Sequence, residues 1–75
     1  MARLPALSWR KIVKIVATRG FEFDHQRGSH MAFRRNDGRM VTIPRHDTID
    51  RRTLKSILKQ AEISRQEFER LVEGV

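Results

Sequence analysis

The pattern of apolar and polar residues near the start of the chain has the period of an α-helix. In residues 8–19 the apolar side chains recur three or four positions apart and share one face, while most basic residues lie elsewhere. Ser8 is a favourable N-cap and Gly20 is a typical stop signal. The pattern predicts a helix over residues 8–19, and its apolar face consists of Trp9, Ile12, Val13 and Val16.

The period then changes to the two-residue alternation of β-strands. It runs through FEFDHQR at 21–27, SHMAFRR at 29–35 and RMVTIP at 39–44. Gly28 can turn the chain with a positive φ, and the pair Asp37–Gly38 is a strong hairpin signal. Three strands joined by tight turns predict an antiparallel meander.

A helical period returns after the third strand. Residues 51–61 place four apolar side chains on one face, and Asp50 or Thr48 could cap this helix. Ser64 and Glu67 have the spacing of a capping box for a short last helix. The apolar side chains of the two helices are Leu54, Ile57, Leu58, Ala61, Phe68, Leu71 and Val72.

The order α-β-β-β-α with a short extra helix predicts an α+β fold. A three-stranded antiparallel sheet would pack one face on the helices and leave its other face to solvent. The length of 75 residues fits one small domain, so we expect a single domain over residues 1–75.

The alternation of the second strand places His30. If Met31 and Phe33 point at the helices, His30 lies on the solvent face, beside the turn at Gly28. The stretch Gly-Ser-His-Met matches the remnant of a cleaved expression tag, which normally stands at an N-terminus. Here a predicted helix and strand precede it, so we treat His30 as native.

Charge and cysteine content restrict the function. Sixteen Lys and Arg against nine Asp and Glu give a net charge of +7, which favours nucleic acid or an acidic protein that mimics it. The chain has no Cys and only three separated His, so we expect no metal and no other cofactor. Its start has no continuous apolar run, so we expect a cytoplasmic protein without a signal peptide or membrane span.

A histidine among arginines on an open sheet face can support the cleavage of RNA. Imidazole exchanges protons near neutral pH, and cations hold a phosphodiester and stabilise the charge that develops on it. RNA carries its own nucleophile, the 2′-hydroxyl, so such an enzyme needs neither a metal nor a protein nucleophile. The spacing alone leaves open an ordinary surface histidine.

Four stretches of the chain resemble the HicA (YcfA-like) toxins of bacterial type II toxin–antitoxin systems. They are Gly28-Ser29-His30, VTIPRH at 41–46, TLKSILKQA at 53–61 and ISRQEF at 63–68. The resemblance implies a fold similar to the double-stranded RNA-binding domain and a small RNase that cuts mRNA and inhibits translation. The catalytic histidine of the family lies in the Gly-Ser-His motif, which implies His30. It also implies a HicB-type antitoxin that covers the site.

The sequence departs from its relatives at two positions. Many relatives have Gly where Glu62 stands, so Ala61-Glu62-Ile63 could lengthen the preceding helix. A small residue is common where Asp47 stands. Neither departure touches His30.

We predict His30 as the general acid or base, with Gly28 shaping the turn and Ser29 aiming the imidazole. His46 is either a second proton-transfer group or phosphate contact, or a structural residue of the loop, and we favour the structural role. His25 is expected to be partly buried or at the edge of the sheet, without chemistry, and Trp9 to belong to the core. The predicted RNA contacts are Lys11, Lys14, Arg27, Arg34, Arg35 and Arg45.

The basic residues of the second helix could face either RNA or an acidic antitoxin. They are Arg51, Arg52, Lys55 and Lys59.

These observations favour a metal-independent endoribonuclease toxin that cleaves mRNA, monomeric alone and hetero-oligomeric with its antitoxin. The alternative is a non-catalytic module that binds double-stranded RNA by shape with the same basic face. A DNA-binding repressor is disfavoured, because no helix-turn-helix pattern is evident.

Overall fold

The helices and strands follow one another in the order that the hydrophobic pattern predicts. The computed structural model describes residues 7–74. Its elements are α1 (Trp9–Ala17), β1 (Glu22–Arg27), β2 (His30–Arg34), β3 (Met40–Pro44), α2 (Arg51–Gln60) and α3 (Arg65–Gly74). The predicted α+β fold is therefore confirmed.

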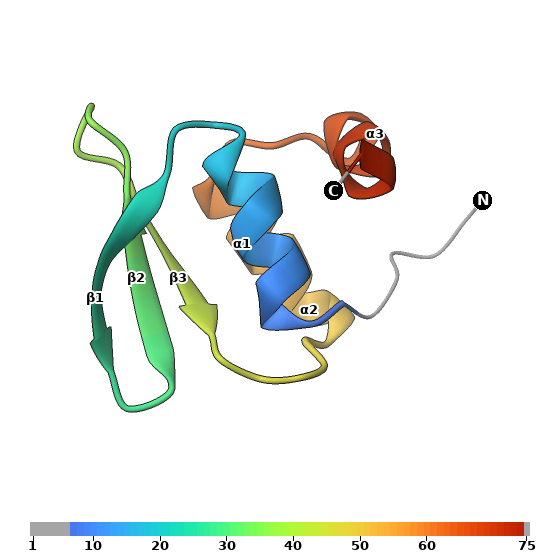
Figure 1. Ribbon diagram of the computed structural model, residues 1–75. Coiled ribbons are helices and arrows are strands. Elements are labelled where there is room, and N and C mark those ends of the chain that lie inside the picture. Colours follow the sequence, from blue (N-terminus) through green and yellow to red (C-terminus); the bar gives the residue numbers. More distant parts are fainter. Residues whose placement is uncertain (1–6, 75) are drawn as a thin grey trace.

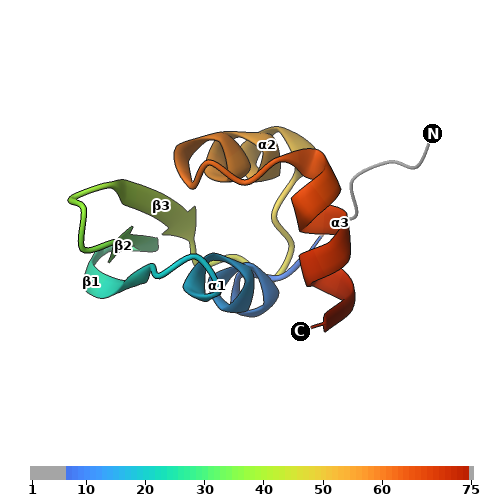
Figure 2. The same ribbon diagram turned by 90° about the horizontal axis from the view of Figure 1, so that it is seen from above.

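The three strands form one antiparallel sheet in the order β1-β2-β3. Helices α1 and α2 lie side by side on one side of the sheet, and α3 lies beyond them, farthest from the strands (Figures 1 and 2). No other element of the part that the structure describes covers the opposite face of the sheet. We call this opposite face the open face.

The hydrophobic core lies between the sheet and the helices. Alternate residues of β2 and β3 point into it, and they meet fully buried side chains of the three helices. Phe21, between α1 and β1, and Phe68 of α3 are the largest side chains that are fully buried. The core residues of the two strands are Met31, Phe33, Val41 and Ile43.

Local hydrogen bonds fix the ends of the helices close to the predicted positions. Asp50 caps α2 by accepting a hydrogen bond of 2.7 Å from the Thr53 N–H, and Ser64 and Glu67 form the predicted capping box of α3. Ser8 occupies the N-cap position of α1 without a hydrogen bond from its side chain. Helix α1 ends at Ala17, two residues earlier than predicted.

The expected extension of α2 through Glu62 is wrong. Helix α2 ends at Gln60, and Glu62 adopts a left-handed conformation with φ of 57°. The Ile63 N–H then returns to the Leu58 carbonyl at 2.9 Å, which is the geometry of a Schellman-type helix end. The hydrogen bonds of this helix end therefore stabilise the chain reversal more than the helical preference of glutamate would stabilise a longer helix.

Replacing Glu62 with glycine should raise the free energy of unfolding by roughly 0.5–1 kcal/mol. A side chain strains the left-handed conformation, whereas glycine adopts it freely. The Glu62 carboxylate also pairs with Arg35 and Arg39, but its side chain is 56% exposed, so the loss of these pairs offsets little of the gain. Urea unfolding of Glu62→Gly and of Glu62→Gln, which removes the charge alone, separates the two effects. A Gly variant less stable than the Gln variant would contradict the prediction.

Candidate functional site

His30 is the first residue of β2 and lies on the open face. Its cross-strand partners are Arg27 of β1 and Pro44 of β3, and its side chain is exposed. The neighbouring Met31 is buried in the core, because successive strand residues point to opposite faces. The predicted location of His30 is thus confirmed, while its chemical role stays a prediction.

Backbone contacts attach the turn before His30 to the end of β3. Gly28 has φ of 59°, which favours glycine, and its carbonyl accepts a hydrogen bond of 2.8 Å from the Gln26 side chain. The Ser29 carbonyl accepts a hydrogen bond of 2.6 Å from the Arg45 N–H. The Gly-Ser-His motif is therefore held against the segment that carries His46.

A cavity of about 350 Å³ lies where the outer edge of β3 meets α2. His30 and His46 both line it, so the structure brings together the two histidines that the sequence singled out. We call it the His30 cavity. Its other lining residues are Thr42, Pro44, Asp50, Thr53, Ser56, Ile57 and Gln60.

The backbone of His46 is fixed on both sides. Its N–H donates to the Pro44 carbonyl at 2.9 Å, and its carbonyl accepts from the Trp9 N–H at 3.1 Å. The first helix is thereby tied to the loop after β3 by backbone groups alone, so the role of the His46 side chain stays a prediction. The exposed imidazole of His46 lines the cavity and takes no part in these backbone hydrogen bonds, so it is available for proton transfer.

The α2 wall of the cavity carries an ordered set of polar groups. The Gln60 side chain accepts a hydrogen bond of 3.0 Å from the Thr42 N–H and donates one of 3.2 Å to Ser56 Oγ. Hydrogen bonds from Thr53, foremost from its backbone N–H, lower the pKa of Asp50. Asp50 is therefore ionised at neutral pH.

Two of the predicted RNA contacts share the open face with His30. Arg27 stands directly opposite His30, and Arg34, at the other end of β2, pairs across the sheet with Glu22 and Met40. Within residues 7–74 neither arginine forms an ion pair with a carboxylate.

The other predicted RNA contacts have different surroundings. The guanidinium of Arg45 lies on the ring of Trp9, 5.0 Å from the ring centroid, and that half-buried ring also carries Arg10. Lys11 and Lys14 belong to α1, which lies on the covered side of the sheet (Figure 1). The structure therefore does not place these two lysines on the face of His30.

Arg35 has a structural role at the far end of β2. Its guanidinium binds both Asp37 and Glu62, and it covers the ring of Phe21 at 5.0 Å. The hydrogen bond from Arg35, followed by one from the Arg39 N–H, lowers the pKa of Asp37 to about 2. Arg35 thus closes the β2–β3 hairpin, and we do not include it among the groups around His30.

Of the two places expected for His25, the edge of the sheet is confirmed, because β1 is an edge strand. Its side chain is exposed, and a bulge between Phe23 and His25 shifts the strand register. Phe23 pairs with Phe33 on the side of the sheet that faces the helices, although its own side chain is exposed, whereas His25 pairs with Ala32 on the open face. His25 Nδ1 is 2.7 Å from a carboxylate oxygen of Asp24.

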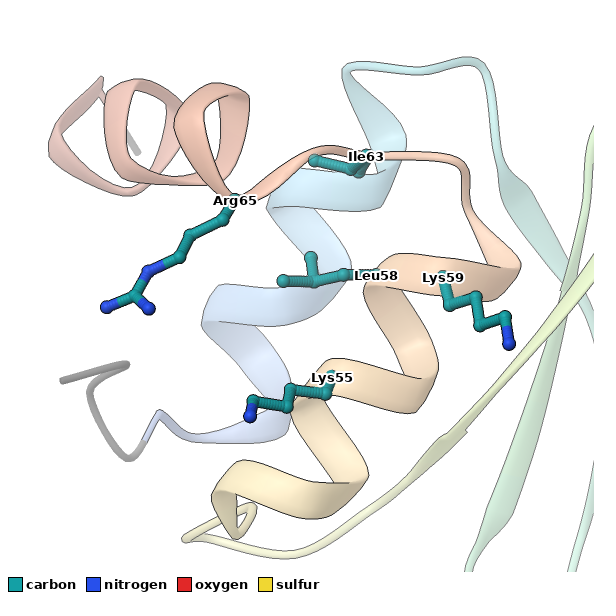
Figure 3. A pocket seen from close by; sticks show the side chains of 5 residues that line it. All are labelled: Lys55, Leu58, Lys59, Ile63 and Arg65. Atoms are coloured by element: carbon teal, nitrogen blue, oxygen red, sulfur yellow. The ribbon is translucent and has the colours of Figure 1, made fainter.

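A second hollow lies between α2 and α3, away from His30. Leu58 and Ile63 point into it, and three cationic side chains extend around it (Figure 3). These are Lys55, Lys59 and Arg65. It contains no histidine, so it offers no proton transfer near neutral pH.

Residues 7–74 contain no group of three or more His, Cys, Asp or Glu side chains that could hold a metal ion. No helix in this range combines the length and the apolar character needed to cross a membrane.

Comparison with models of known protein families gives a match. The sequence model of a family described as "HicA toxin of bacterial toxin-antitoxin" matches residues 9–63, which is well over half of the chain. A search of curated proteins found no match. The matched range contains all the elements that build the His30 cavity.

Proposed function

The chain belongs to the HicA toxin family of bacterial toxin–antitoxin systems, and from this we propose that it is a metal-independent endoribonuclease that cleaves mRNA and thereby inhibits translation. The observation that carries the proposal is the presence of His30 and His46 in one cavity. Two imidazoles beside one phosphodiester can divide the two proton transfers of RNA cleavage between them.

In the proposed reaction the 2′-oxygen of a ribose attacks the adjacent phosphorus. One imidazole takes the proton of the 2′-hydroxyl as the new O–P bond forms. The bond from phosphorus to the 5′-oxygen of the next nucleotide breaks, and the protonated second imidazole gives that oxygen a proton. The products are a 2′,3′-cyclic phosphate and a free 5′-hydroxyl, and no water is consumed in this step.

The arginines of the open face supply the positive charge for this step. The Cβ atoms of directly opposed strand residues lie about 4.5–5.5 Å apart, so the Arg27 guanidinium can reach a phosphate held at His30. It would stabilise the charge on the non-bridging oxygens. Arg34 lies four residues along β2 from His30, about 13 Å at the usual rise of a strand, where it can hold another part of the RNA backbone.

A HicB-type antitoxin is the proposed protein partner. The open face is exposed, carries His30 and has two arginines without carboxylate partners within residues 7–74. An acidic protein surface would neutralise these arginines and deny RNA access to the imidazole. We propose a cytoplasmic toxin that is monomeric alone and hetero-oligomeric with its antitoxin.

The proposal predicts which chemical groups stand at the ends of the RNA fragments, and it predicts that a metal chelator does not slow the reaction. The purified protein, incubated with a 5′-labelled single-stranded RNA in EDTA, should give fragments that end in 2′,3′-cyclic phosphate and begin with 5′-hydroxyl. Treatment with acid and then phosphatase, followed by electrophoresis, identifies these ends. Cleavage only with added Mg²⁺ would contradict the mechanism. Salt-dependent binding without scission would instead favour the double-stranded RNA-binding alternative.

A further inference from the structure

We propose that the α2 wall of the His30 cavity is a nucleobase subsite that prefers a base with an exocyclic amine next to the cleaved bond. This inference rests on the proposed function, because it places the scissile phosphate at the His30 end of the same cavity. Its ligand class is a nucleotide of single-stranded RNA, with cytosine or adenine favoured over uracil.

The size and floor of the cavity suit a flat base. Its volume of about 350 Å³ falls at the lower end of the range for small-molecule sites. Pro44 and Ile57 are buried residues in its lining, so the floor of the cavity is apolar. The polar groups stand around this apolar surface, which is the usual composition of a specific binding site.

The polar groups are fixed before any ligand arrives. Gln60 is held by the Thr42 N–H and by Ser56 Oγ, so its amide does not need to be ordered on binding. The Ser56 oxygen accepts from Gln60, which leaves its O–H free to donate. The α2 wall thus presents a donor at Ser56 and acceptors at Asp50.

Asp50 sets the direction in which a nucleotide can enter. Its carboxylate accepts from the Thr53 N–H, and hydrogen bonds from the Thr53 side chain and the Arg52 backbone also act on it. A carboxylate has about four lone-pair sites, so it can still accept from a ligand. The negative charge repels a phosphate, whereas Arg27 stands beside His30 at the sheet. The phosphate therefore lies at the histidine end of the cavity and the base at the α2 end.

The same carboxylate sets the base preference. A carboxylate only accepts hydrogen bonds, and it pairs with the exocyclic amine of cytosine. Adenine carries a comparable amine, whereas uracil presents a carbonyl oxygen at the corresponding position. Uracil held in the same orientation would place its C4 oxygen against the carboxylate, and it can offer its N3–H to Asp50 only by shifting in the cavity, which is a specific penalty rather than a missing contact.

Asp50→Asn is the variant that tests the subsite without removing the helix cap. Asparagine is as good an N-cap as aspartate, and it adds an NH₂ donor where the carboxylate offered only acceptors. The ligands are cytidine 3′-monophosphate and uridine 3′-monophosphate, whose bases differ at C4, which carries an amine or a carbonyl, and at N3, which is an acceptor or an N–H donor. Binding is followed by chemical-shift titration, which requires no catalysis.

The wild-type protein should bind the cytidine nucleotide about fivefold to tenfold more tightly than the uridine nucleotide. Asp50→Asn should abolish or reverse this preference. Asp47→Asn, an exposed substitution in the same loop that does not line the cavity, should keep it. Equal affinities in the wild type, or a preference unchanged in Asp50→Asn, would overturn the subsite.

Sequencing the fragment ends from an RNA with randomised bases separates this inference from the proposed function. Enrichment of cytosine or adenine at one position beside the cut, lost in Asp50→Asn, supports the subsite. Cleavage with no such enrichment overturns the subsite and leaves the nuclease intact. A nucleotide preference in the titration, without any cleavage of RNA, would instead refute the proposed function and retain the binding site.

Discussion

Replacing His30 with alanine should lower the rate of RNA cleavage by about 10²–10⁴-fold and leave the fold intact. This is the range that a positioned proton-transfer group contributes to catalysis. The side chain is exposed and does not belong to the hydrophobic core, so its removal leaves no void there. The measurement is the initial rate of cleavage of a labelled RNA in EDTA, with thermal unfolding of both proteins as the check of folding.

Two further histidine variants test whether the effect is specific to the histidines of the cavity. His25→Ala removes another exposed imidazole from the open face, one that does not line the cavity, and should cleave at the wild-type rate. His46→Ala should slow the reaction and remove one limb of the pH–rate profile, because the second proton transfer loses its donor or acceptor. A His30→Ala protein that degrades RNA as fast as the wild type would refute the mechanism. Loss of activity in His25→Ala would indicate that His25, and not His46, makes the second proton transfer.

The placement of His30 could be predicted because it depends on local features alone. Strict alternation through β2 decides its face, and Gly28 marks the turn before it. The helix caps at Asp50 and Ser64 are equally local, since each acts on the next three residues. These elements agree with one another along the chain, which is why the sequence predicts the fold so well.

The face of the sheet on which His25 lies could not be predicted, because a bulge is a property of two strands. Alternation from Phe23 assigns His25 to the core side, and only the pairing with β2 reveals the extra residue that sends it to the open face. The ion pairs of Arg35 could not be predicted for a related reason. Its two carboxylate partners are Asp37, which is close in sequence, and Glu62, which is not.

The His30 cavity itself depends on contacts between distant segments. Gln60 meets the edge of β3 at Thr42, eighteen residues away in the chain. The register that pairs His30 with Pro44 brings the loop with His46 to the same end of the sheet. No periodicity encodes either contact. The sequence singled out His30 and His46, with a structural role favoured for His46, but it did not predict that they line one cavity.

The removal of one oxygen from the substrate should abolish cleavage altogether. In a chimeric oligonucleotide whose only ribonucleotide stands at the cut site, replacing that ribonucleotide by its 2′-deoxy form removes the attacking nucleophile. Nothing in the proposed step can substitute for it, because the protein contributes proton transfer and charge but no bond to phosphorus. Electrophoresis of the labelled oligonucleotides, one with the ribonucleotide and one without, measures the difference.

Binding of the deoxy oligonucleotide should persist, because phosphate contacts do not depend on the 2′-hydroxyl. If Arg27 and Arg34 are the two principal contacts, log K should fall with log salt concentration at a slope of about −1.4 for a single strand. The same slope for both oligonucleotides would separate binding from chemistry, since the lost oxygen then changes only the bond-forming step. Scission of the all-deoxy strand at a comparable rate would require a water molecule or a protein group as nucleophile, and internal attack by the ribose would be refuted.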